Sequence, residues 1–210
     1  MPPGETTGKR SMATADEVLF YWFGDEPDDG RLADQRGALW WSKNATTDAE
    51  IRERFGTLVR AAGQGERDAW ARTPRGRLAL VILMDQFTRN IHRDTPDAFA
   101  LDDRALTHAL DGIETEEDRD LRPIERVFLY MPLEHAEDMA MQECSVAMFQ
   151  ALRDEVPAAH KQPFDVFLDF AIRHRDVIAR FSRFPHRNAI IGRQSTAEEL
   201  AFLEQPGSSF

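Results

Sequence analysis

Residues 74–92 of this chain read PRGRLALVILMDQFTRNIH, a near-continuous apolar run that ends in a cluster of polar side chains. Pro74 suits the first turn of a helix, where its missing N–H leaves no hydrogen bond unmade. The run from Leu78 to Met84 is too uniformly apolar for a surface helix, so we expect this helix to lie enclosed in the core. Elsewhere, apolar residues recur at spacings of three and four, and no alternating β-branched run with hairpin turns occurs. The sequence therefore predicts an all-α fold.

Seven or eight helices follow from these spacings and from N-cap and proline signals. Short connections predict antiparallel pairs of helices, either bundled or stacked as a solenoid. Asp25–Gly37 is interpreted as a solvated loop, and Pro132 as a kink or boundary. We expect a disordered N-terminal tail over residues 1–13 and a single domain over 14–210. The expected helices are 16–23, 47–63, a helix from Pro74 that passes through Met84, 97–110, 123–131, 133–155, 163–181 and 197–203.

The composition excludes several kinds of partner. The chain has 210 residues, with 26 Lys plus Arg against 37 Asp plus Glu, and hence a net charge of −11. A charge of this sign repels phosphate backbones and anionic lipids, so we expect neither nucleic acid nor a membrane as partner. Cys144 is the only cysteine, which excludes an intrachain disulfide and fits a reducing cytoplasm. No residue pattern indicates the oligomeric state.

A first polar cluster, Asp85–Asn90, continues the apolar stripe of the central helix. Asp85 and Arg89 are one turn apart and are expected to be at least partly buried, where a carboxylate needs a partner. The pair fits a structural ion pair that fixes helix packing, or one wall of a polar pocket. The sequence leaves both open.

Histidines lie on two other apolar stripes, His135 within residues 128–149 and His174 within residues 167–181. Histidines in such positions are more often satisfied core residues than ligands. His186, in a loop, adds a third. His135 or His174, tuned by Glu137, is therefore a candidate general base. The four residues His135, Glu137, His174 and His186 lack the spacing of known metal motifs, and we expect no metal.

The loop from Phe184 to Thr196 concentrates hydrogen-bond donors. Ser195 or Thr196 can cap the last helix, and Arg187 and Arg193 lie close to its free N–H groups. This arrangement fits an anion site, or equally a capped helix whose arginines pair with acids of neighbouring helices. Trp40 and Trp41, in a non-helical approach to the second helix, fit a lid over the core or a stacking surface for a ligand.

Together these motifs resemble the DUF924 family of bacterial proteins over about residues 15–203. The resemblance implies a tetratricopeptide-like, right-handed α-α superhelix, although no 34-residue repeat is visible in this chain. It implies no activity, because the family's function is unknown. Ala136 stands where a serine is expected in many relatives, and Thr88 where a proline is frequent. The motifs that carry the resemblance are Val18–Phe23, Trp40-Trp41, Met84–Ile91, Phe128–Pro132, His135–Glu137, His174-Arg175, Phe184–Asn188 and Gly192–Thr196.

We expect the polar clusters to converge on one concave pocket that binds a small anionic or polar ligand or a peptide carboxylate, without a cofactor. One alternative is a hydrolase-type enzyme with His135 or His174 as general base, with or without a metal. Another is a helical scaffold for protein partners. Arg187→Ala and Arg193→Ala are expected to change stability by at most about 1 kcal/mol. The candidate ligand-binding residues are Asp85, Gln86, Arg89, Asn90, His174, Arg175, His186, Arg187, Asn188, Arg193 and Ser195.

Overall fold

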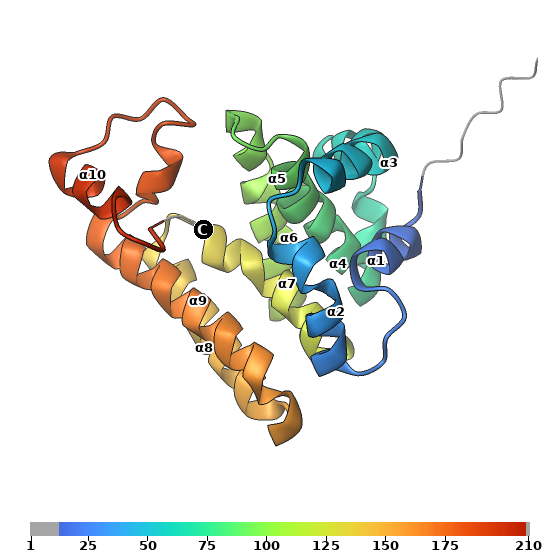
Figure 1. Ribbon diagram of the computed structural model, residues 1–210. Coiled ribbons are helices and arrows are strands. Elements are labelled where there is room, and N and C mark those ends of the chain that lie inside the picture. Colours follow the sequence, from blue (N-terminus) through green and yellow to red (C-terminus); the bar gives the residue numbers. More distant parts are fainter. Residues whose placement is uncertain (1–12, 209–210) are drawn as a thin grey trace, which may run out of the picture.

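The computed structural model describes residues 13–208, which contain helices and no β-strand (Figure 1). The prediction of an all-α fold is confirmed. The expected disordered tail lies, except for its last residue, outside the described residues. No helix within residues 13–208 is long and apolar enough to cross a membrane. The α-helices are α1 (Ala15–Phe23), α2 (Asp29–Trp41), α3 (Ala45–Gly63), α4 (Pro74–Val81), α5 (Thr88–Ile91), α6 (Asp102–Glu114), α7 (Pro123–His135), α8 (Met139–Glu155), α9 (Lys161–Phe181) and α10 (Ala197–Leu203).

The centre of the core is the helix that the apolar run predicted. The Thr73 side chain accepts from the N–H of Gly76, and Pro74 occupies the first turn. Between α4 and α5 the chain forms a π-helical segment, η2 (Ile82–Phe87), so that α4, η2 and α5 are one continuous helix. π-Helical turns are rare and often occur at functional sites. This one carries Asp85 and Gln86.

The helix α7 separates two parts of the molecule (Figure 1). On one side it packs against α4 and α6, and on the other against α8 and α9. The short turn η5 (Ala158–His160) joins α8 to α9, which lie side by side and antiparallel. α2 contacts both α7 and α9. Side chains from α2, η2, α5, α7 and α9 can therefore face a common space.

The segment expected to be a solvated loop is mostly the helix α2. The Asp28 side chain caps it by accepting from the N–H of Arg31 at 2.8 Å. Leu32 and Trp40 are buried, and the Trp40 indole donates to the carbonyl of Trp22 at 3.1 Å. The expectation that Trp40 and Trp41 lie in non-helical chain was also wrong, because they end α2. With α4, η2 and α5 counted as one, residues 13–208 form nine helices, one more than the upper expectation.

The helix boundary expected as one possibility at Pro132 is also wrong, and the kink stays a prediction. α7 runs through Pro132 and ends at His135. The break follows at residues 136–138, where the Asp138 carboxylate accepts from the N–H of Met141 at 3.0 Å and caps α8. His135 therefore lies at the end of α7, at the point where the chain leaves the core.

Gly76 supplies a stability prediction, because it lies against the turn that precedes α4. A Cβ at this position would lie 2.1 Å from the carbonyl oxygen of Trp70, which is backbone and cannot swing aside. Gly76→Ala should therefore destabilise the protein by about 1–3 kcal/mol. Gly56→Ala, in the middle of α3 with its nearest neighbouring atom at 4.0 Å, should stabilise it by about 0.5–1 kcal/mol. Urea unfolding gives the free energy of unfolding of both variants. Similar changes in that free energy for Gly76→Ala and Gly56→Ala would contradict the close approach of Gly76 to the carbonyl of Trp70.

Candidate functional site

Two cavities meet at His135. The larger has a volume of about 580 Å³ and the smaller about 410 Å³. The larger is lined by Trp40, Trp41, Ser42, Lys43, Gln86, Arg89, Asn90, Arg93, Val127, Met131, Glu134, His135, Phe149, Val166, Phe167, Phe170 and His174. The smaller is lined by Phe99, Asp102, Asp103, Leu106, Pro132, His135, Ala136, Glu137, Asp138, Arg187 and Ile191.

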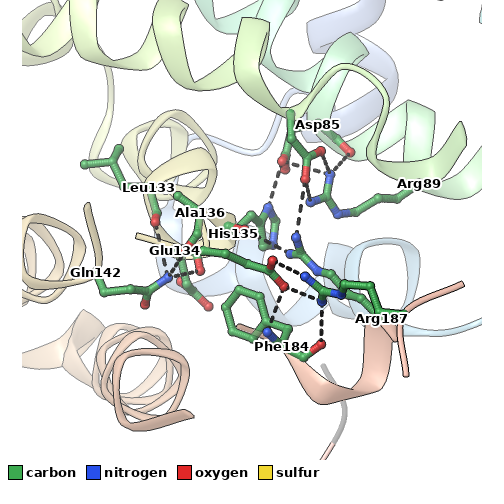
Figure 2. Close-up of polar contacts among 12 residues, drawn as sticks. Asp85, Arg89, Leu133, Glu134, His135, Ala136, Gln142, Phe184 and Arg187 are labelled. Atoms are coloured by element: carbon green, nitrogen blue, oxygen red, sulfur yellow. Dashed lines mark hydrogen bonds and ion pairs between the residues drawn. The ribbon is translucent and has the colours of Figure 1, made fainter. Parts of the chain in front are cut away.

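His135 is held by a buried carboxylate. Its Nδ1 lies 2.7 Å from Oδ1 of Asp85, which is fully buried (Figure 2). The same carboxylate contacts Nη1 of Arg89 at 3.0 Å and accepts from the Gln86 amide at 2.5 Å. A buried charge needs such partners. Asp85 thus has three, of which the pair with Arg89 was expected from the sequence and the contact with His135 was not.

The charges around this pair set its protonation. Burial alone would raise the pKa of Asp85, but Arg89 and His135 outweigh burial and hold that pKa below its usual range. The pKa of His135 is lowered by burial and by Arg89, with Asp85 opposing both. An ionised carboxylate only accepts hydrogen bonds, so the neutral imidazole carries its proton on Nδ1. The Nε2 lone pair is then on the opposite edge of a ring that lines both cavities.

A second carboxylate and histidine pair lies beside the first. Nδ1 of His174, on α9, is 2.8 Å from Oε1 of Glu134 and 2.8 Å from the carbonyl oxygen of Phe170. The rings of His135 and His174 are 6.2 Å apart between centroids. Both members of this second pair line the larger cavity and are almost fully buried. Both partners of His174 Nδ1 are acceptors, so this nitrogen also carries a proton.

Arginines connect the central helix to the loop that follows α9. Arg89 donates to both oxygens of Asp102, each at 3.0 Å, a bidentate pair. Nη1 of Arg187 lies 3.6 Å from the same carboxylate, and its Nη2 donates to the carbonyl of His135 at 3.0 Å. Asp102 thus bridges two guanidiniums. Arg187 fixes the backbone of His135 (Figure 2).

The burial of Arg187 contradicts the expectation that it behaves as a surface residue. Only 8% of it is exposed, and its guanidinium carbon lies over two rings, 4.7 Å from the centroid of Phe99 and 4.5 Å from that of Phe184. Burial, together with the nearby charge of Arg89, lowers the pKa of Arg187 to about 10, so it stays protonated at neutral pH. Its removal would take one of two cations from Asp102, a donor from the carbonyl of His135 and a buried side chain from between packed elements, so a loss of only about 1 kcal/mol is no longer expected.

The rest of the loop forms a separate network around Glu137. Arg193 binds both oxygens of Glu137, at 2.5 and 2.8 Å, and the N–H of Phe184 donates to the same carboxylate at 2.8 Å. Burial would raise the pKa of Glu137, but Arg193 holds it below its usual range. Nε of Arg193 also donates to Asn188, whose amide donates to Ser195 at 3.0 Å. Arg193, Asn188 and Ser195 thus hold the loop together and line neither cavity.

Three other candidates lie apart from His135 or have structural partners. Asn90 lines the larger cavity, but its amide donates to Asp48 at 2.8 Å. Arg175 pairs with the neighbouring Asp176 on the outside of α9. His186 lines neither cavity, and burial with the nearby Arg187 lowers its pKa to about 3. The structure therefore brings Gln86, Arg89, Asn90, His135 and His174 to one cavity.

Several residues of the site were not expected from the sequence. Asp102 and Lys43 gave no signal, because neither interrupts an apolar pattern. Glu134 was visible only as part of a polar cluster around His135. Within residues 13–208, no group of three or more His, Cys, Asp or Glu side chains is placed to hold a metal ion.

Comparison with known proteins agrees with the fold. The profile of DUF924, bacterial proteins of unknown function, matches residues 18–207. The chain belongs to the DUF924 family. A similar solved structure is that of a protein of unknown function, ATU0120, from Agrobacterium tumefaciens. It is 34% identical, with a TM-score of 0.76, and the match covers 90% of this chain and 96% of that one. A search of the curated proteins gave no significant match to this DUF924 member.

Proposed function

We propose that this protein is a hydrolase-type enzyme in which His135 acts as general base in the larger cavity. The observation that carries the proposal is the 2.7 Å contact between Asp85 and Nδ1 of His135. A buried carboxylate on one imidazole nitrogen fixes the tautomer and leaves the other nitrogen to take a proton. The lowered pKa of His135 supports this role, because the imidazole is then neutral at neutral pH.

The reaction that fits this arrangement is water attack on an ester or amide carbonyl. Nε2 of His135 takes a proton from water while the water oxygen bonds to the carbonyl carbon. The bond from that carbon to the leaving oxygen or nitrogen then breaks, and His135 returns the proton to the leaving group. Arg89 lines the same cavity and is 21% exposed at its side chain, so its charge can stabilise the negative oxygen of the intermediate.

The alternative of ligand binding without chemistry is favoured by one observation, the largely apolar lining of the larger cavity. The three arginines expected to serve such a ligand, Arg89, Arg187 and Arg193, all have acidic partners, and of the three Arg89 alone lines the larger cavity. The scaffold alternative expects every polar group to be buried and paired, whereas His135 and Arg89 line a cavity.

Two further proposals concern the arrangement of the helices and the location of the protein in the cell. We propose a tetratricopeptide-like arrangement of the helices, supported by the antiparallel α8–α9 pair and by the packing of α7 on α8. We also propose a cytoplasmic location, supported by the use of a single cysteine, Cys144.

The proposal predicts a particular pH dependence of hydrolysis. Protonation of His135 removes the lone pair that acts as base, so kcat/KM should fall by about tenfold per pH unit on the acid side. Because the pKa of His135 is lowered, the inflection should lie below the ordinary histidine value of about 6.5, with a plateau above it. The assay uses p-nitrophenyl acetate, butyrate and octanoate with p-nitroanilides of the same acids. No hydrolysis of any of them, or an inflection above pH 6.5, would count against the proposal.

A further inference from the structure

Exposed apolar side chains gather at the mouth of the larger cavity. Trp41 is 48% exposed, Val166 43% and Phe170 39%, and all three line this cavity. Trp41 ends α2, and Val166 and Phe170 are one turn apart on α9. Large apolar side chains grouped at a concave surface are a common feature of ligand sites.

The apolar wall continues into the cavity, and its aromatic rings are packed on one another. The ring of Trp41 stacks on Phe128 at 5.8 Å and an interplanar angle of 11°, and lies 5.8 Å from the ring of Phe167. Val127 and Met131, from α7, line the interior. A ligand that enters therefore meets apolar surface from the mouth inward, which favours an apolar body on that ligand.

The charged side chains of the same cavity are mostly cations, although the protein carries a net charge of −11. Arg89 is paired with Asp85 and Asp102, and Arg93 forms a bidentate pair with Asp48. Glu134 is the only acid of the lining, and it contacts His174. Carboxylates thus already neutralise both guanidiniums, so an anionic group on a ligand needs the third cation of the lining, Lys43.

Lys43 is the cation that a ligand can use. It is exposed, it lies two residues after Trp41 in the connection between α2 and α3, and it lines the cavity. Among residues 13–208 it makes no ion pair or hydrogen bond. A free ammonium beside an apolar wall recognises an anion that carries an apolar group.

We propose that the larger cavity takes an amphipathic carboxylate, with its apolar body on Trp41 and Phe170 and its anionic group on Lys43. This inference deepens the proposed function, on which it rests for the position of the hydrolysed bond at His135. The ligand class itself follows from the lining alone and can be tested without turnover.

The test is calorimetric titration of the purified protein with octanoate, butanoate and octylamine. Octanoate should bind at least tenfold more tightly than butanoate, and octylamine should bind at least tenfold more weakly than octanoate. Lys43→Gln should lower the affinity for octanoate by about fivefold or more, and so should Trp41→Ala. The matched controls are Lys161→Gln and Phe20→Ala, which lie outside the lining and should leave affinity unchanged. The proposal is overturned if octanoate gives no heat of binding, or if butanoate or octylamine binds as tightly as octanoate. It is also overturned if the variants and their controls change the affinity for octanoate equally.

The outcome separates this inference from the proposed function. If octanoate binds but no ester is hydrolysed, the proposed hydrolase activity is wrong and the proposed ligand class stands. If esters are hydrolysed but octanoate esters react no faster than butyrate esters, the proposed ligand class is wrong and the proposed hydrolase activity stands.

Discussion

Replacement of His135 by asparagine is expected to lower kcat/KM for ester hydrolysis by a factor of about 10²–10⁴, the usual contribution of a positioned general base. Asparagine keeps an amide that can hydrogen-bond to Asp85, so the packing around the buried carboxylate survives. It cannot take a proton from water. The measurement is the rate of release of p-nitrophenol from the best substrate at pH 7.5, with both proteins at equal concentration.

His92 provides the matched control, because it is exposed at 39% of its side chain and lines neither cavity. His92→Asn should leave the rate within about twofold of the unmodified protein, as surface changes do. Full activity of His135→Asn would contradict the assignment. So would loss of activity in His174→Gln together with unchanged activity in His135→Asn, since the base would then be the other histidine.

Asp85→Ala should destabilise the protein by about 3–5 kcal/mol, the range for removing one partner of a buried ion pair. The change deprives Arg89, His135 and Gln86 of their common acceptor. Arg89 keeps Asp102, which places the expected loss toward the lower end of that range. Urea unfolding followed by circular dichroism gives the free energy directly.

Asp97→Ala is the comparison for this variant, since the Asp97 side chain is 75% exposed and its removal should change stability by no more than about 0.5 kcal/mol. Asp85→Asn should fall between the two, because the amide keeps the shape and part of the hydrogen bonding. Equal stability of Asp85→Ala and Asp97→Ala would show that the carboxylate does not hold the buried cations.

Most of the fold could be predicted from the sequence, because helix signals are local. The start of α4 at Pro74 follows from a short pattern and is confirmed. The sequence predicted a capped start of α10 but left the cap between Ser195 and Thr196, and the structure has it at Thr196. The segment Asp29–Trp41 could not be predicted, since its glycines and acids are typical of a loop. Burial of Leu32 and Trp40 outweighs these weak local preferences. Pro132 likewise stays helical within a helix that is buried over most of its length.

The site could be predicted only in part, because its partners come from distant helices. The pair of Asp85 with Arg89 follows from a spacing of four residues and is confirmed at 3.0 Å. The contact of Asp85 with His135 joins positions 50 residues apart, and no local pattern reports it. The loop arginines showed a density of donors, but their acceptors, Asp102 and Glu137, lie on other parts of the chain.

The central claim is that Asp85 fixes His135 as a neutral base with its lone pair on Nε2, and nitrogen NMR of the histidine side chains tests it most directly. We expect the Nδ1–H tautomer for His135 at pH 7.5 and a pKa below about 6.5. In Asp85→Asn the pKa should fall further, because the charge that raises it is gone. An Nε2–H tautomer, or a pKa above 6.5 in the unmodified protein, would contradict the account.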